Sequence, residues 1–155
     1  MKKKMNNKGF SLVELIIVIA IMAVLMVVLA PQLLKYVEKT RLQKDNSAIS
    51  EITNAIEIAC ADEKVLNAIP TGGMTFTFEG AAGANKVCTF TDADALNKEL
   101  KETIGTSVTT SSTTYKNAAA GVVINVSNAS GTVTITLDNF YSDTKTKEAD
   151  GYKFN

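Results

Sequence analysis

Hydrophobic residues are concentrated in one segment near the start of the chain. Residues 10–30 read FSLVELIIVIAIMAVLMVVLA, in which only Ser11 and Glu14 are not apolar. A helix needs about 20 apolar residues to cross a bilayer, so this segment is long enough. A basic cluster without an acidic residue precedes it: Lys2, Lys3, Lys4 and Lys8. This charge bias predicts that the N-terminus stays in the cytoplasm and that the rest of the chain is exported.

The end of the apolar segment favours a retained anchor over a cleaved secretory signal peptide. No small-x-small cleavage site followed by a loop comes after Ala30. Beyond Pro31 the apolar residues instead recur mostly every three to four positions, which predicts an amphipathic helix: Leu34, Val37, Leu42, Ile49, Ile52, Ile56, Ala59 and Cys60.

The two patterns together predict one helix from Ser11 to Leu66, about 84 Å long at 1.5 Å per residue. Such a helix is too long for a domain of this size. We expect its first half to protrude and its second half to pack on a sheet. Pro31 lies inside the helix, where it should introduce a kink or melt a turn.

The remainder of the chain reads as strands and turns. Alternating apolar residues predict strands at 74–78 and 87–90, and a hairpin of 122–126 and 132–137 around a five-residue turn. The fold class is therefore α+β, a long N-terminal helix on an antiparallel sheet.

Three further segments are polar. Asp92 is expected to cap a short helix that runs through Ile104, with Asp94 near its positive end. The Ser/Thr-rich residues 107–115 form either a polar edge strand or a loop. The tail after residue 138 has aromatic side chains that can pin it to the domain: Tyr141, Tyr152 and Phe154.

Composition narrows the chemistry. The chain has 155 residues, 16 basic and 16 acidic side chains, two cysteines, and neither histidine nor tryptophan. The absence of histidine excludes Ser-His-Asp and Cys-His catalysis and His-ligated zinc or haem. A net charge of zero argues against a nucleic-acid-binding protein. No catalytic residue, metal site or cofactor is expected.

Glu14 is the residue that the apolar pattern does not explain. A carboxylate at the centre of a bilayer costs about 2.5–3.5 kcal/mol, and no lysine or arginine lies within the next twenty residues. Cleavage between Gly9 and Phe10 would create an α-amino group four residues away. That amine could meet Glu14 in the same helix or in another copy. The alternative is a glutamate that snorkels to the cytoplasmic face.

The run Lys8-Gly9-Phe10-Ser11-Leu12-Val13-Glu14-Leu15 resembles the N-terminus of type IV prepilins. It follows a short basic leader and precedes an apolar stretch that ends at Pro31, so the resemblance covers residues 8–31. It implies that a membrane aspartic peptidase, the prepilin peptidase, cuts after Gly9 and that Phe10 is N-methylated. It also implies that Glu14 registers an incoming subunit by meeting a neighbour's N-terminal amine.

The resemblance further implies a domain organisation and a function. Residues 1–9 would be a leader peptide, residues 10–37 the membrane and filament-core helix, and residues 38–155 an extracellular domain. The protein would be a structural, non-enzymatic subunit of a helical homo-oligomeric pilus for adhesion, motility or biofilm formation. It would start in the cytoplasmic membrane and end in the extracellular filament, assembled by an ATPase and membrane platform proteins. The absence of an evident extra domain favours a major subunit.

Two alternatives remain open from the sequence. A pseudopilin of a type II secretion or DNA-uptake system shares the N-terminal signature. A single-pass anchored enzyme or binding domain that does not polymerise is the other.

The chain departs from the family in its cysteines, because no cysteine follows Cys88 and a C-terminal disulfide is therefore absent. Cys60 and Cys88 could form a bond outside the cell that closes a loop of about 29 residues, worth about 3–4 kcal/mol. They could equally be two buried free thiols.

Two other patterns are weaker. Asn125 and Asn128 begin glycosylation sequons, which are common by chance. A calcium loop is not expected because the spacing of the candidate ligands fits no EF-hand: Asp138, Asp143 and Asp150.

Overall fold

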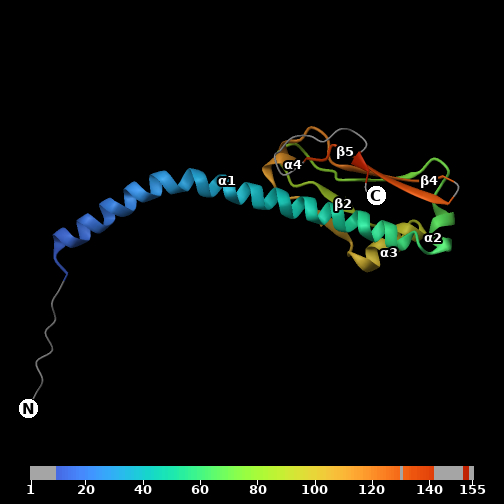
Figure 1. Ribbon diagram of the computed structural model, residues 1–155, viewed down its shortest axis with the longest axis horizontal. Helices are drawn as coiled ribbons and strands as arrows, with labels where there is room; N and C mark the ends of the chain where they lie inside the picture. Colours follow the sequence, from blue (N-terminus) through green and yellow to red (C-terminus); the bar gives the residue numbers. More distant parts are fainter. Residues whose placement is uncertain (1–9, 130, 142–151, 154–155) are drawn as a thin grey trace, which may run out of the picture. The chain divides into compact units, whose positions relative to one another are not determined.

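The computed structural model describes residues 10–129, 131–141 and 152–153. The chain divides into two compact units, Met1–Val37 and Glu38–Asn155. Helix α1 (Leu12–Ala59) contributes residues to both (Figure 1). The prediction of a leader at residues 1–9 lies outside the described residues.

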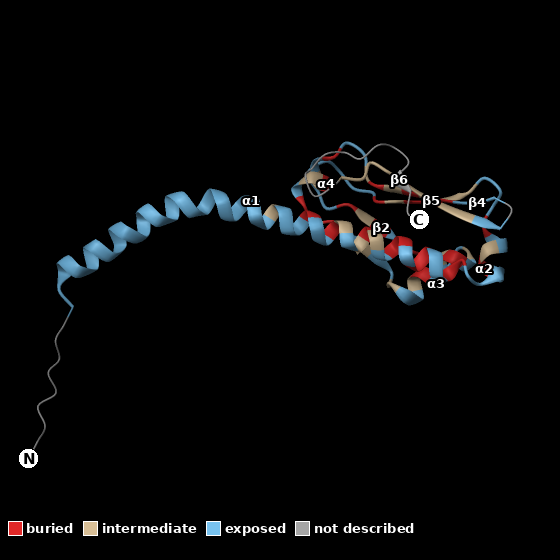
Figure 2. Ribbon diagram, viewed as in Figure 1, coloured by how far each residue is buried: buried red, intermediate tan, exposed pale blue. Residues whose placement is uncertain are grey.

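In the first unit, α1 is an uninterrupted helix whose residues are all exposed, and Val37 at the boundary is the least exposed of its large apolar side chains, at 36% (Figure 2). Pro31 lies inside α1, and the helix continues through it. The alternative of a melted turn is therefore wrong, while a bend at Pro31 stays a prediction. A proline removes one hydrogen bond from a helix, and the turns on either side hold the remaining ones.

The second unit is built on the last six turns of α1. Every third or fourth residue of this part is buried: Leu42, Asp45, Ile49, Ile52, Thr53, Ala55, Ile56 and Ala59. The same spacing keeps charged and amide side chains on the opposite face exposed. One face of the helix therefore joins the core and the other faces solvent.

A four-stranded antiparallel sheet packs with this face of α1. Its order is β1-β4-β5-β6, with β1 at Met74–Thr77, β4 at Val123–Ala129, β5 at Thr132–Asp138 and β6 at Tyr152–Lys153. In the central pair, Ile124 lies opposite Leu137 and Val126 opposite Ile135. All four are buried and belong to the same apolar cluster as α1, which confirms the α+β fold class.

Smaller elements surround this core. Helix α2 (Glu63–Ala68) follows α1. Strands β2 (Val87–Thr89) and β3 (Ser107–Thr109) form a two-stranded antiparallel sheet, and helix α3 (Ala95–Thr103) connects them along the chain. Helix α4 (Thr113–Asn117) precedes β4.

The first helix ends earlier than predicted, at Ala59 rather than Leu66. The amides of Ala61 and Asp62 bond three residues back, to Ile58 and Ala59, so the last turn is tightened. The Asp62 side chain then accepts a hydrogen bond from the Lys64 amide and begins α2. An N-cap inside the apolar pattern therefore divides one expected helix into two.

Other expected boundaries also move. Asp94, and not Asp92, caps α3 by accepting from the Asn97 amide at 2.8 Å. The predicted 122–126/132–137 hairpin is confirmed, but β4 runs to Ala129, which pairs with Thr132, so its turn is shorter than five residues. The Asn128 side-chain oxygen accepts from the Gly131 amide, and Gly131 has φ 84°, a conformation that glycine favours.

Residues 107–115 were expected to form an edge strand or a loop. They contain β3, an edge strand of the two-stranded sheet, and also the start of α4, a helix that was not expected. Two carboxylates of α1 hold this segment. Both oxygens of Asp45 accept from the Ser111 amide at 2.9 Å, and Oδ2 also accepts from the Ser112 amide at 2.7 Å. Glu38 accepts from the Thr113 hydroxyl at 2.8 Å and the Thr114 amide at 3.2 Å. The N-terminus of α4 is therefore anchored to α1 by negative charge.

The start of the tail is held on the same side of α1. The Asn46 amide donates to the Tyr141 carbonyl at 2.9 Å, and its oxygen accepts from the Tyr115 hydroxyl at 2.7 Å. The two tyrosine rings meet edge to face, 5.5 Å apart. Tyr141 thus pins the tail as expected, and Tyr152 lies in β6 opposite Leu137. Phe154 lies outside the described residues.

We predict that Asp45→Ala destabilises the full-length protein in detergent by about 3 kcal/mol. Asp45 is 2% exposed, so its loss leaves two amides without their acceptor. Chemical denaturation followed by circular dichroism measures the change. Asp92→Ala is the matched control, since its exposed pair with Lys101 is worth less than about 1 kcal/mol. Equal stabilities of the two variants would contradict this role of Asp45.

Candidate functional site

The candidate site begins where α1 begins. Ser11 precedes the first helical residue, Leu12, and Glu14 lies in the first turn. The Glu14 Oε2 atom accepts a hydrogen bond from the Ser11 amide at 2.9 Å. In the capping-box arrangement S-x-x-E, a glutamate reaches back in this way to the amide of the residue that precedes the helix. Glu14 thus stabilises the start of its own helix.

The same carboxylate is available to a second partner. Glu14 is exposed, and the described residues give it no hydrogen bond besides the one at Oε2. From Phe10 to Leu34 it is the only charged residue. Oε1 can therefore accept from a donor on another molecule without disturbing the cap.

Phe10 lies directly before this cap and is 89% exposed. Its nitrogen is one residue before the amide that Glu14 already binds. The structure therefore places Phe10 and Glu14 at the same end of one helix. Gly9, the residue on the other side of the predicted cleavage site, lies outside the described residues.

The surface around Glu14 is apolar over six helical turns. No large hydrophobic side chain from Leu12 to Leu34 is less than 45% exposed. Helix α1 is long and apolar enough to cross a membrane, and none of its most apolar window is buried. Soluble monomers rarely expose a continuous apolar patch of this extent, so another apolar phase or another protein is expected to cover it.

The two cysteines are buried free thiols, so the bond considered from the sequence is absent. Cys60 lies just after α1 and Cys88 lies in β2, and both belong to the apolar core. Burial raises the pKa of the Cys60 thiol. Burial, with a smaller contribution from the nearby Glu79 carboxylate, raises the pKa of the Cys88 thiol to about 11. Both sulfurs are therefore protonated at neutral pH and behave as small apolar side chains.

The weaker candidate sites are occupied by structural contacts. The Asn125 amide nitrogen donates to Asp138 at 2.7 Å, and that of Asn128 donates to the Leu66 carbonyl at 3.1 Å. Both sequon nitrogens thus hold the fold together. Among the described residues no group of three or more potential metal ligands occurs. Asp143 and Asp150 lie outside the described range.

Two features of the site were not anticipated from the sequence. The S-x-x-E spacing at Ser11 is a helix-start signal in the sequence, whereas the sequence-based interpretation of Glu14 rests on its charge alone. The anchoring of α4 by Asp45 and Glu38 needed the tertiary structure, because the contacts span more than 60 residues.

Comparisons with known proteins agree with this geometry. A family model described as the prokaryotic N-terminal methylation motif matches residues 4–30, which include Gly9, Phe10 and Glu14. The chain is 32% identical over 91 residues to a type IV major fimbrial protein FimA of Dichelobacter nodosus, covering 59% of this chain and 58% of that protein. A second FimA of that organism is 31% identical over 81 residues, covering 52% and 51%.

The chain therefore spans about half the length of the curated relatives it matches. No solved structure matches it significantly. The resemblance of the N-terminal residues to type IV prepilins is confirmed by the matched motif and by these fimbrial relatives.

We predict that neither cysteine of the folded protein reacts with iodoacetamide at pH 8, because the attacking species is the thiolate and both thiols are buried and protonated. Denaturant should expose both to alkylation without any reductant. Intact mass spectrometry reads the number of labels. A denatured protein that takes up label only after reduction would show that the two sulfurs are bonded.

Proposed function

We propose that this chain is the structural subunit of an extracellular type IV pilus, polymerised from a membrane-anchored precursor through the first half of α1. One observation carries the proposal. Within the matched range, residues 12–30 form the first part of α1, an exposed apolar helix with a single carboxylate in its first turn. The fimbrial proteins that the chain resembles support it.

The precursor is held in the cytoplasmic membrane by the apolar part of α1, with residues 38–155 outside. The lysines at positions 2, 3, 4 and 8 set this orientation. Cleavage after Gly9 by a prepilin peptidase then removes these four of the 16 basic side chains and none of the 16 acidic ones. The mature subunit is acidic, and its new first residue, Phe10, carries an α-amino group that N-methylation leaves charged.

Assembly exchanges lipid contacts of α1 for protein contacts. Packing between apolar helices alone does not select one axial step, since burial is non-directional. A charge pair selects one step, because each charge costs free energy in hydrocarbon unless it lies next to its opposite. Glu14 Oε1, which the cap leaves available, meets the α-amino group of Phe10 in a neighbouring subunit and sets the register.

The work of assembly comes from other proteins. The chain has no phosphate-loop motif, so an assembly ATPase and membrane platform proteins must extrude the filament. The subunit itself performs no catalysis. Its role is structural, in a homo-oligomer that serves adhesion, motility or biofilm formation.

We predict that Glu14→Ala leaves the protein processed and inserted in the membrane but strongly reduces the number of filaments. The substitution keeps the apolar surface and removes the partner of the neighbouring amine. Electron microscopy of sheared filaments and immunoblots of membranes measure the two quantities. Glu63→Ala, which removes an exposed carboxylate from α2, should assemble normally. Wild-type filament numbers in the Glu14→Ala strain would refute the registering role.

We predict that Gly9→Val blocks processing, because a branched side chain then occupies the position before the cut. Intact mass should show the full leader and an unmodified Phe10. The wild-type protein should begin at N-methylated Phe10. Recovery of methylated Phe10 at the N-terminus of the variant would contradict cleavage after Gly9.

A further inference from the structure

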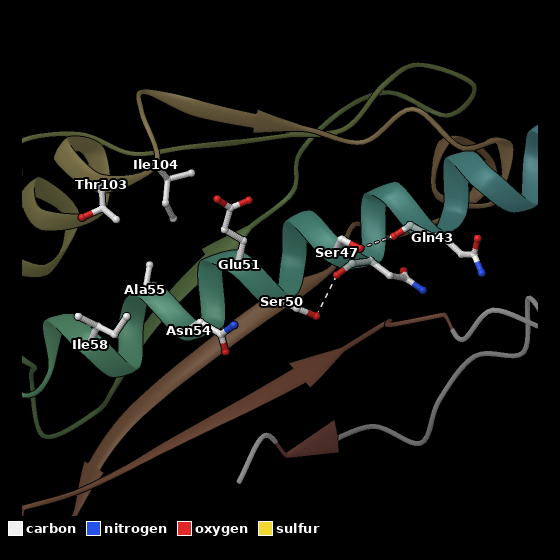
Figure 3. Close-up of a pocket in the computed structure, with 10 residues that line it drawn as sticks. Gln43, Ser47, Ser50, Glu51, Asn54, Ala55, Ile58, Thr103 and Ile104 are labelled. Atoms are coloured by element: carbon white, nitrogen blue, oxygen red, sulfur yellow. Dashed lines mark hydrogen bonds between the residues drawn. The ribbon is translucent and has the colours of Figure 1, made fainter.

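The face of α1 turned away from the core in the second unit is hollowed into an open groove of about 680 Å³. Along α1 it is lined at spacings of three and four residues by Gln43, Ser47, Ser50, Asn54 and Ile58. Thr103 and Ile104, at the end of α3, form one wall (Figure 3). Ile58 is 75% exposed in this groove, although it is a large apolar residue.

Two exposed opposite charges lie along the same side of this face. Glu51 extends from α1 on the side of Ile104 (Figure 3). Lys44 precedes it by seven residues, which is nearly two full helical turns, or about 10.5 Å along the axis. The basic charge therefore lies towards the N-terminal end of the groove and the acidic charge further along α1.

Neither charge is neutralised within its own chain in the described residues. No acidic residue lies three or four positions from Lys44, and no basic residue lies at these distances from Glu51, so neither can form the usual pair along a helix. The one ion pair among the described residues is Lys101 with Asp92, on other elements. Lys44 and Glu51 are thus exposed, unpaired, and two turns apart on one face.

We propose that this face is a contact between two copies of the chain, in which Lys44 of one copy pairs with Glu51 of a copy displaced by two helical turns. The proposal rests on the proposed pilus function, because it needs copies aligned in parallel. It adds a second registering pair, outside the membrane helix, to the pairing of Glu14 with Phe10.

We favour a second copy of this chain over an unrelated partner because the charges on this face complement those on the same face of another copy. They do so only when the two copies are shifted along the helix axis. Two parallel copies in exact register would place Lys44 beside Lys44 and Glu51 beside Glu51. A shift of seven residues replaces both repulsions by one attraction. Each copy still offers an unused charge at either end, so the contact repeats head to tail and generates an open filament.

The two registering pairs demand displacement in the same direction. In each pair the carboxylate comes later in the sequence than the cation. To bring the two groups to the same level, the copy with the carboxylate must be displaced in the N-terminal direction relative to the copy with the cation. The sequence offsets are four residues for Phe10 and Glu14 and seven for Lys44 and Glu51. The two offsets differ by three residues, or about 4.5 Å along a helix axis. Lysine and glutamate side chains are long enough to span this difference, so one displacement between copies can satisfy both pairs. The small Ser47 and Ser50 side chains between the charges let another element approach closely.

Disulfide cross-linking tests the contact directly. In the Lys44→Cys/Glu51→Cys variant, mild oxidation of filaments should give a ladder of disulfide-linked multimers on non-reducing gels. The matched control is Lys44→Cys/Glu57→Cys, in which the second position lies on another side of α1. It should give no ladder, and the buried Cys60 and Cys88 are common to both variants. No ladder from the first variant, or a bond to a different protein, would overturn the proposal.

Charge reversal supplies an independent readout. Lys44→Glu and Glu51→Lys should each reduce filament yield, and the double exchange should restore it because the pair is re-formed with opposite sense. Membrane levels of the subunit should stay constant, since both residues are exposed. If the wild type forms filaments and each single charge reversal forms them in equal yield, this contact is overturned and the proposed function is left intact. Absence of wild-type filaments would overturn both.

Discussion

The structure depends on one constraint, which is that the first half of α1 has an apolar surface that the described part of the chain does not cover. From Leu12 to Leu34 every large apolar side chain is at least 45% exposed, and the only charged residue is Glu14. Burial of such a surface supplies most of the free energy of association, but it does not specify a geometry. We propose that the single carboxylate at the start of the helix, that of Glu14, supplies the missing direction.

The second half of α1 solves a different problem with the same helix. One face carries Ile49, Ile52 and Ile56 into a core shared with the antiparallel sheet, and Asp45 fastens α4 to it. The opposite face is polar apart from Ile58, and it carries Lys44 and Glu51, which have no ion-pair partner in the described part of the chain. The helix therefore has a folding core on one side and, on the other, the surface that we propose contacts another copy.

Much of this arrangement was predictable from the sequence because it depends on periodicity. The change from a continuous apolar run to a three-to-four spacing separates the exposed part of α1 from the part that packs. Alternation in 122–126 and 132–137 located the central hairpin. The run from Lys8 to Leu15 indicated the methylation motif because glycine, phenylalanine and glutamate occur there at fixed positions before the apolar segment.

The remaining features depend on competition between local signals. The apolar pattern continues past Ala59, but Asp62 caps a new helix and so ends the first one. Asp92 and Asp94 are both good caps, and only Asp94 bonds to the Asn97 amide. Helix α4 was missed because its start is anchored by Asp45 and Glu38, which are distant in sequence. The free state of Cys60 and Cys88 was undecidable from spacing, because two thiols can share a core without a bond.

We propose that copies of this chain form a filament through α1. Immunogold electron microscopy of intact cells, with antibodies against residues 38–155, tests it most directly. We expect gold particles at intervals along the whole length of extracellular filaments. Gold confined to the cell surface, beside filaments that carry none or in the absence of filaments, would contradict it.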